Sequence, residues 1–279
     1  MNKSIVYCAI MLILIIAISG CVQQGTINQA TQNQNNQNQM DGIENETKVE
    51  PLNEHQNAQL ITYGDNYRGY LVTPKRPGEF PGVVLIHEWW GLNDNIKQEA
   101  NNLAKEGYVV LAVDLYNGQV AATSDKAREL AGAARSNPQP AIDQMKAGAD
   151  YLRSHERVSG KVASMGWCFG GGMAMQHSLN DDLDATVIYY GTLETDKQKL
   201  STIDWPVLGI FGSEDQSIPL SSVGEFDKSL DSLGIENEIY IYDGVGHAFA
   251  NPSNAGHDQA KTKDAWDKTV LFLNKHLKT

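Results

Sequence analysis

Short apolar runs alternate with amphipathic segments from Leu60 to the last residue, Thr279. The run Val83–Ile86 predicts a buried strand, and a helix is predicted over Asn93–Glu106, ended by Gly107. The alternation then continues to the end of the chain. The other predicted strands are Tyr108–Val113, Val162–Met165, Ala185–Tyr190, Val207–Phe211 and Glu238–Tyr242, and the other predicted helices are Ala141–Ser154, Gly170–Ser178, Leu220–Leu233 and Gln259–His276.

Strands that are apolar throughout and separated by helices are typical of a mostly parallel sheet covered by helices on both faces. The sequence therefore predicts one α/β domain over residues 60–279, without an internal repeat or a second folded domain. Ligands of such sheets bind at the carboxyl ends of the strands. Candidate chemistry is therefore sought in the loops that follow each strand.

The start of the chain has a different pattern. Lys3 is followed by an almost wholly apolar run, Ile5–Ile18, and then by Ser19-Gly20-Cys21. This run is shorter than the ~20 residues that a membrane-spanning helix needs, and it fits the core of a signal peptide. The motif resembles the lipobox of prokaryotic lipoproteins. It predicts a signal peptide over residues 1–20, a lipidated Cys21 and a domain anchored to the extracytoplasmic face of the membrane; an uncleaved anchor would leave the domain on the same side.

Residues 21–59 are predicted to be a disordered tether behind the lipidated cysteine. From Asn28 to Gln39, every residue except Ala30 and Thr31 is Asn or Gln. Such a segment cannot bury enough apolar surface to offset its ordering entropy. The whole chain carries a net charge of −12 without a basic cluster, which argues against a nucleic-acid partner.

Of the three cysteines, only Cys168 lies in the predicted domain, so it has no partner there for a disulfide. It is either a reactive thiol or a small buried side chain. Its surroundings, Gly166-Trp167-Cys168-Phe169-Gly170, follow a strand and precede a helix, which is the pattern of a nucleophile elbow. The helix N-terminus favours an anion and hence the reactive thiolate.

Two further loops supply the usual partners of such a nucleophile. Asp215 follows the Val207–Phe211 strand within Gly212–Pro219 and suits a carboxylate that orients a histidine, although Glu214 competes for that role. Of the seven histidines, only His247 follows the final strand, between small residues. The order nucleophile, acid, histidine is the order of α/β-hydrolases.

These motifs resemble the dienelactone hydrolase family of the α/β-hydrolase superfamily, over essentially all of residues 60–279. The resemblance rests on the motifs His87-Glu88-Trp89-Trp90-Gly91, Asp114-Leu115-Tyr116, Gly166-Trp167-Cys168-Phe169-Gly170-Gly171, the Asp215 loop and Gly246-His247-Ala248-Phe249. It implies an α/β-hydrolase fold and a Cys-His-Asp triad that hydrolyses small esters, lactones or thioesters through an acyl-enzyme.

The resemblance also assigns roles around the triad. Cys168 attacks the carbonyl, His247 transfers protons and Asp215 fixes the tautomer of His247. The backbone N–H groups of Trp89 and Phe169 form the oxyanion hole. Glu88 corresponds to the family glutamate that contacts the resting thiol and helps to ionise it; as a residue alone, it would equally fit a solvent-facing loop carboxylate.

One position departs from the family pattern. Members that cleave dienelactone carry an arginine four residues after the histidine, where it binds the substrate carboxylate, whereas this chain has Asn251. A second such arginine corresponds to Arg128 only if the register of its loop is the family's. An amide in place of a guanidinium removes the charge match to an anion, so the resemblance implies the reaction type rather than dienelactone as the substrate.

Other function classes remain as alternatives. A catalytically silent ligand- or partner-binding lipoprotein would use the same fold, and a peptidase or acyltransferase would use the same triad. A redox thiol would need a resolving cysteine, which the domain lacks. No metal site is predicted, because His and carboxylate residues are scattered singly, and no cofactor is predicted, because no glycine-rich phosphate loop follows the first strand.

Overall fold

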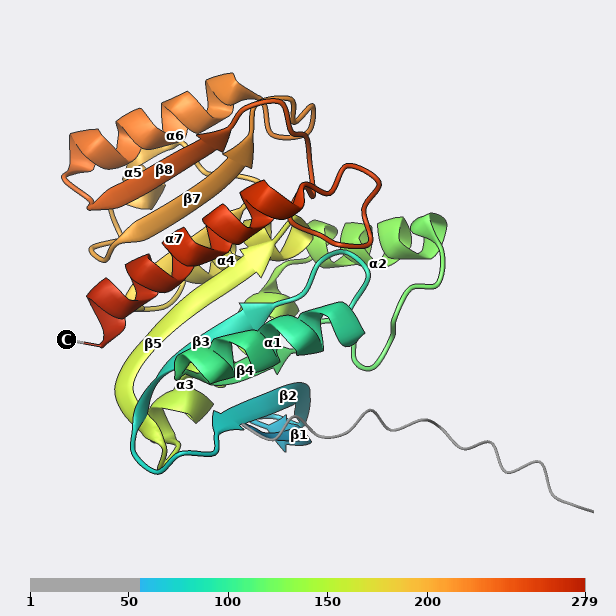
Figure 1. Ribbon diagram of the computed structural model, residues 1–279, viewed down its shortest axis with the longest axis vertical. Helices are drawn as coiled ribbons and strands as arrows, with labels where there is room; N and C mark the ends of the chain where they lie inside the picture. Colours follow the sequence, from blue (N-terminus) through green and yellow to red (C-terminus); the bar gives the residue numbers. More distant parts are fainter. Residues whose placement is uncertain (1–55, 279) are drawn as a thin grey trace, which may run out of the picture. The chain divides into compact units, whose positions relative to one another are not determined.

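The computed structural model describes residues 56–278. Within this part of the chain, eight strands form one sheet in the order β1-β2-β4-β3-β5-β6-β7-β8 (Figure 1). The strands are β1 (Gln56–Tyr63), β2 (Tyr67–Pro74), β3 (Phe80–Ile86), β4 (Val109–Val113), β5 (Val158–Trp167), β6 (Ala185–Tyr189), β7 (Val207–Gly212) and β8 (Asn237–Tyr242). β2 runs antiparallel to β1 and β4, and the other neighbouring pairs are parallel. The predicted, mostly parallel sheet is confirmed.

Helices cover both faces of the sheet. The helices are α1 (Asp94–Glu106), α2 (Ser124–Ser136), α3 (Gln139–Ser154), α4 (Phe169–Ser178), α5 (Lys197–Leu200), α6 (Leu220–Leu233) and α7 (Gln259–Leu277). Figure 1 shows α1 and α7 in front of the sheet, and both helices contribute to one apolar core. Residues of α2, α3, α4 and α6 fill the cores on the opposite face.

Strand β3 explains why the sequence shows continuous apolar runs rather than alternation. All of its residues are buried. Val83 and Leu85 point into the core beneath α1 and α7, whereas Val84 and Ile86 point into the core beneath α3 and α4. Full burial of one such side chain contributes about 1.5–3 kcal/mol, so both faces of this central strand hold the layers together.

The predicted ends of α1 are confirmed. Asn93 is the N-cap, and its side chain accepts a hydrogen bond from the backbone N–H of Ile96 at 3.2 Å. Gly107 ends the helix in the left-handed conformation, with φ of 93°. The N-cap fixes where the chain leaves the loop after β3, which carries Glu88 and Trp89.

The structure adds elements that the pattern analysis did not predict. Strands β1 and β2 precede β3, and β1 begins at Gln56, before the predicted domain start at Leu60. An edge strand is held by backbone pairing to one neighbour and needs no apolar run; Leu60 itself is 66% exposed. The segment around Arg128, interpreted as a loop, is helix α2, with Thr123 as its N-cap.

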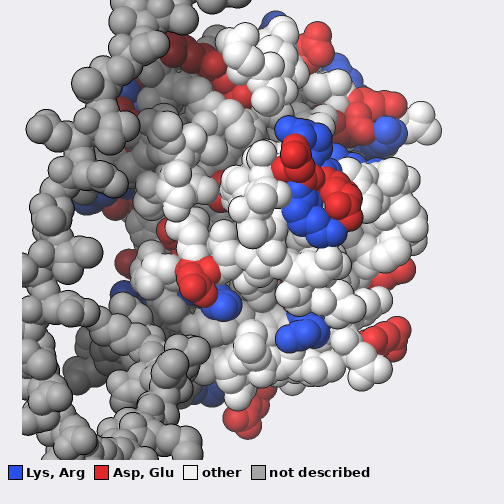
Figure 2. Space-filling model, turned by 90° about the vertical axis from the view of Figure 1, so that its right-hand side faces the viewer, with Lys and Arg blue, Asp and Glu red and all other residues white. Residues whose placement is uncertain are grey.

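The predicted signal peptide (1–20), the lipidated Cys21 and nearly all of the tether (21–59) lie outside the described residues. No helix within residues 56–278 is both long and apolar enough to cross a bilayer. On the face of the molecule seen in Figure 2, basic and acidic side chains lie next to one another and do not gather into a patch of one sign.

Candidate active site

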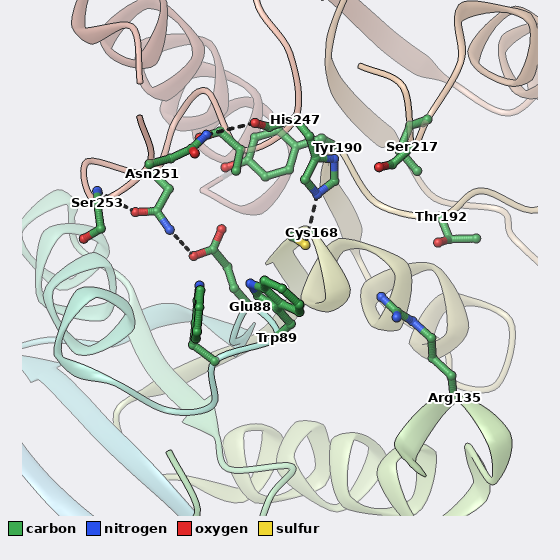
Figure 3. A pocket seen from close by; sticks show the side chains of 14 residues that line it. Glu88, Trp89, Arg135, Cys168, Tyr190, Thr192, Ser217, His247, Asn251 and Ser253 are labelled. Atoms are coloured by element: carbon green, nitrogen blue, oxygen red, sulfur yellow. Dashed lines mark hydrogen bonds between the residues drawn. The ribbon is translucent and has the colours of Figure 1, made fainter. Parts of the chain in front are cut away.

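The three predicted triad residues follow three strands that end at the same edge of the sheet. Cys168 follows β5, Asp215 lies in the loop after β7, and His247 lies in the loop after β8. Because β5, β6, β7 and β8 are parallel neighbours in this order, their carboxyl ends bring residues far apart in sequence together. Figure 3 shows Cys168 and His247 meeting at the centre of one cavity.

Cys168 occupies a sharp turn between β5 and α4. Its φ of 54° and ψ of −116° lie outside the regions that L-residues normally adopt. The turn needs the flanking glycines, because a Cβ on Gly166 would overlap the carbonyl of Gly170, and a Cβ on Gly170 would overlap the carbonyl of Ile86. The predicted elbow geometry is present, and it holds the thiol at the N-terminus of α4.

The three side chains form one continuous hydrogen-bonded chain. His247 Nε2 lies 3.0 Å from Cys168 Sγ, and His247 Nδ1 lies 2.7 Å from Asp215 Oδ2. The other carboxylate oxygen, Oδ1, accepts the backbone N–H groups of Ser217 at 2.7 Å and Ile218 at 3.0 Å. Asp215 is thereby fixed in one orientation, and it fixes the imidazole in turn.

The interactions among these three side chains keep Asp215 ionised and His247 basic. Burial raises the pKa of Asp215, but the hydrogen bond and charge of His247 outweigh it, so that the pKa falls below the usual value. Burial lowers the pKa of His247, yet its hydrogen bonds to Asp215 and Cys168 raise that pKa to about 10. At neutral pH the imidazole is therefore a strong proton acceptor.

The two residues predicted to form the oxyanion hole flank the thiol from different elements. Phe169 is the first residue of α4, where the backbone N–H groups have no acceptor within the helix. Trp89 lies in the turn after β3 and lines the cavity beside Cys168. The close approach of Gly170 to the carbonyls of Ile86 and His87 brings these two turns together.

His87 has a structural role in positioning the turn after β3. Its ring is fully buried, and burial lowers its pKa to about 4, so it is neutral. Nε2 accepts the backbone N–H of Leu115 at 3.2 Å, which leaves Nδ1 as the donor to the carbonyl of Glu88 at 2.6 Å. The imidazole thus ties the turn that carries Glu88 to the end of β4.

Glu88 lies in the cavity wall but is not hydrogen-bonded to the thiol. Glu88 is 3% exposed, and its carboxyl group accepts a hydrogen bond from the side-chain amide of Asn251 (Figure 3). The amide is itself fixed, because Asn251 Oδ1 accepts the backbone N–H of Ser253 at 2.8 Å. Burial raises the pKa of Glu88 to about 7, against the opposing influence of Asn251 and His247. Asn251 therefore holds the carboxyl group of Glu88 in place.

Cys168 and His247 open into a cavity of about 680 Å³, a size that suits a small molecule. Trp89, Trp90, Thr192 and Ser217 belong to its lining. The remaining lining residues are Glu88, Arg135, Tyr190, Ile218, Ala248, Asn251, Ser253 and Asn254. The sequence analysis identified Trp89 and Trp90 but not Thr192, Ser217 or Tyr190, which carry no recognisable spacing.

The arginine at this cavity is Arg135 rather than Arg128. Arg128 projects into solvent from α2 and forms an ion pair with Asp125 at 2.7 Å. Arg135, near the end of the same helix, lines the cavity and lies over the Phe169 ring, 5.4 Å from its centroid. Figure 3 shows its side chain extending toward Cys168. The two arginines lie about two helical turns apart along α2, so only the one nearer the end of the helix reaches the cavity, which a loop interpretation could not reveal.

Comparison with known proteins identifies the family of this chain. The model of the dienelactone hydrolase family matches residues 67–277, and the chain belongs to that family. A relative from Aquifex pyrophilus, Protein usf, is 34% identical over 80% of this chain and 99% of its own length. A putative carboxymethylenebutenolidase from Saccharolobus solfataricus is 30% identical over 76% of this chain and 95% of its own.

Solved structures agree on the fold. The crystal structure of a putative dienelactone hydrolase from Klebsiella pneumoniae has a TM-score of 0.68 and 24% sequence identity, and the match covers 77% of this chain and 97% of that one. The predicted α/β-hydrolase fold is therefore confirmed, and the family relationship makes the protein a hydrolase of the dienelactone hydrolase type. Within residues 56–278, no three His, Cys, Asp or Glu side chains cluster in a way that could hold a metal ion.

Proposed function

We propose that this protein is a cysteine hydrolase that cleaves small esters, lactones or thioesters through an acyl-enzyme on Cys168. The observation that carries the proposal is the unbroken chain from Sγ to His247 (3.0 Å) and from His247 to Asp215 (2.7 Å). A buried carboxylate, a basic imidazole and a thiol at a helix N-terminus together generate a thiolate nucleophile.

In the first half of the reaction, His247 Nε2 takes the thiol proton and the thiolate of Cys168 attacks the substrate carbonyl. The negative charge passes to the carbonyl oxygen, which the backbone N–H groups of Trp89 and Phe169 stabilise. The tetrahedral intermediate then collapses: the bond to the leaving oxygen or sulfur breaks, His247 supplies the proton to the leaving group, and a thioester remains on Cys168.

In the second half, a water molecule gives a proton to His247 and its oxygen attacks the thioester carbonyl. The same N–H groups hold the second oxyanion. The bond to Sγ breaks, the carboxylic acid leaves, and the proton on His247 returns to the thiolate. No outside oxidant or cofactor is needed, because hydrolysis only exchanges an acyl group and a proton.

The charge distribution in the cavity indicates which substrates fit. Asn251 offers a neutral amide, and that amide is already bound to Glu88. Arg135 forms no ion pair or side-chain hydrogen bond with the described residues, so its guanidinium is available to an anionic group at its end of the cavity. We infer that acidic substituents bind at α2, while the end lined by Trp89 and Trp90 takes apolar groups.

The direct test is hydrolysis of p-nitrophenyl acetate by the full-length protein and by Cys168→Ala. The proposal predicts turnover by the wild type and none by the variant, with equal melting temperatures. Equal turnover by both proteins would exclude Cys168 as the nucleophile. Absence of turnover in both, including with lactones and thioesters, would favour the silent ligand-binding alternative.

We also propose that the protein is a lipoprotein on the extracytoplasmic face of the membrane, attached through Cys21. The support is the sequence Ile18-Ser19-Gly20-Cys21 behind the apolar run Ile5–Ile18. In a lipoprotein-processing host, the wild type should incorporate a labelled fatty acid and remain in the membrane fraction. Cys21→Ala should lose the label; a label retained by this variant would overturn the anchor.

A further inference from the structure

Tyr190 combines two unfavourable features directly beside the candidate site. It follows β6 with φ of 35°, a left-handed conformation that is uncommon for a bulky residue. Its side chain is fully buried, and its hydroxyl group has no hydrogen-bond partner within residues 56–278. Buried polar groups are nearly always paired, so an unpaired one beside a reactive centre calls for a functional explanation.

The surroundings of Tyr190 determine the protonation state of its hydroxyl group. Its ring packs against His247, with 5.2 Å between the centroids. Burial, followed by the charges of Glu88 and Cys168, raises the pKa of Tyr190. The hydroxyl therefore stays protonated and remains a hydrogen-bond donor at every working pH.

One oxygen of the Glu88 carboxyl group lacks a hydrogen-bond donor. One carboxyl oxygen, Oε2, accepts the Asn251 amide, and no other hydrogen bond to this carboxyl group occurs among the described residues. Glu88, Asn251 and Tyr190 line both the large cavity and a second, small one. Figure 3 shows Glu88 and Asn251 on the opposite side of the large cavity from Arg135 and Thr192. Tyr190, whose hydroxyl group has no acceptor, thus lines the same two cavities as Glu88, whose carboxyl group has one oxygen without a donor.

The small cavity has the size and polarity of a water site. Its volume is about 10 Å³, close to the ~10–15 Å³ that one buried water occupies. Besides Glu88, Tyr190 and Asn251, it is lined by Asn95 and Glu99 of α1 and by Trp167 and Ala250. A water held there can accept a hydrogen bond from the Tyr190 hydroxyl and donate to both carboxyl groups, which meets the two to four partners that a buried water needs.

We propose that one water molecule in this small cavity joins the Tyr190 hydroxyl to the carboxyl group of Glu88, and that Tyr190 is a positioning residue which favours ionised Glu88. The catalytic consequence rests on the proposed hydrolase function. A donor aimed at the ionised form of an acid lowers its pKa, so loss of the hydroxyl raises the pKa of Glu88. The titratable groups that face Glu88 are Tyr190, His247 and Cys168, with Glu99 on α1.

The test uses Tyr190→Phe, with Tyr116→Phe as its matched control. The phenylalanine keeps the ring against His247 and removes only the hydroxyl. Tyr116 also carries a buried hydroxyl without a partner, 5.6 Å from Phe169 between ring centroids, but it lines neither cavity. The two variants therefore make the same chemical change, and only one of them makes it at the proposed water.

Two measurements decide the proposal. A high-resolution crystal structure of the wild type should show a water within hydrogen-bonding distance of Tyr190 and Glu88. In the pH dependence of kcat/KM, the acidic limb of Tyr190→Phe should move to higher pH by about 0.5–1 unit, while Tyr116→Phe should overlay the wild type. A small cavity without ordered density, or an unmoved acidic limb in Tyr190→Phe, would overturn the proposal. If the wild type cleaves no ester, the proposed hydrolase function fails, and the crystal structure alone decides the water site.

Discussion

Substitution of Asp215 by Asn tests how strongly the chain from carboxylate to thiol controls reactivity. The amide has the shape of the carboxylate, so the buried site is filled as before. Its oxygen should keep the backbone N–H groups of Ser217 and Ile218, which lie 2.7 Å and 3.0 Å from Oδ1. The NH2 group then faces His247 Nδ1, where the structure has an acceptor at 2.7 Å.

The result is a histidine in the wrong tautomer. With Nδ1 forced to accept, the ring proton sits on Nε2 and points at Sγ, which lies 3.0 Å away. The imidazole can then no longer take the thiol proton. Loss of general-base catalysis costs about 10²–10⁴-fold, and we expect kcat/KM of Asp215→Asn to fall within this range.

The assay is ester hydrolysis combined with alkylation of the thiol by iodoacetamide. Both rates should fall in Asp215→Asn, because the pKa of His247 returns toward its usual value and less thiolate forms. Glu214→Gln is the control: Glu214 is the exposed neighbouring carboxylate and should leave both rates unchanged. Activity of Asp215→Asn within a few-fold of the wild type, or an equal loss in Glu214→Gln, would refute the reasoning.

Three further predictions test the cavity, the loop after β3 and the elbow. In steady-state kinetics, Arg135→Gln should raise KM about 10-fold for an ester with a carboxylate substituent and leave KM for a neutral ester unchanged. The control variant Arg128→Gln should change KM for neither ester. Burial lowers the pKa of His87 in the folded state to about 4, below its usual 6.5. The free energy of unfolding is therefore highest above pH 6.5 and falls by up to about 3 kcal/mol as the pH drops toward 4, because the unfolded chain then binds a proton that the folded chain does not. In urea titrations, the free energy of unfolding of His87→Gln should depend less on acid pH. Gly170→Ala should prevent folding because its Cβ would overlap backbone carbonyls, whereas Gly132→Ala in α2, where nothing lies within 4 Å, should raise the melting temperature.

Much of the fold follows from the sequence because the central strands are buried on both sides. Val83–Ile86 needs apolar residues at every position, and the glycines around Cys168 are required by close backbone contacts. Such constraints act within a few residues and leave a visible pattern. The antiparallel strand β1 was missed because pairing to a single neighbour leaves its side chains partly exposed, and its composition then resembles that of the preceding segment.

The order of the three loops also predicted which side chains meet, since parallel strands place their carboxyl ends together. The details of the cavity did not follow, because they depend on side-chain direction between distant elements. The pairing of Glu88 with Asn251 joins two loops, and the sequence analysis expected Glu88 at the thiol. Likewise, the choice between Arg128 and Arg135 depends on which end of α2 lies against the cavity.

The most direct test of the account is whether Cys168 becomes acylated during turnover. The full-length protein is mixed rapidly with p-nitrophenyl acetate, the release of p-nitrophenol is followed, and acid-quenched samples are digested for mass spectrometry. The account predicts a burst of p-nitrophenol up to the enzyme concentration and one acetyl group on the peptide that carries Cys168. Hydrolysis without a burst and without acetylated Cys168, or an acetyl group on another residue that persists in Cys168→Ala, would contradict it.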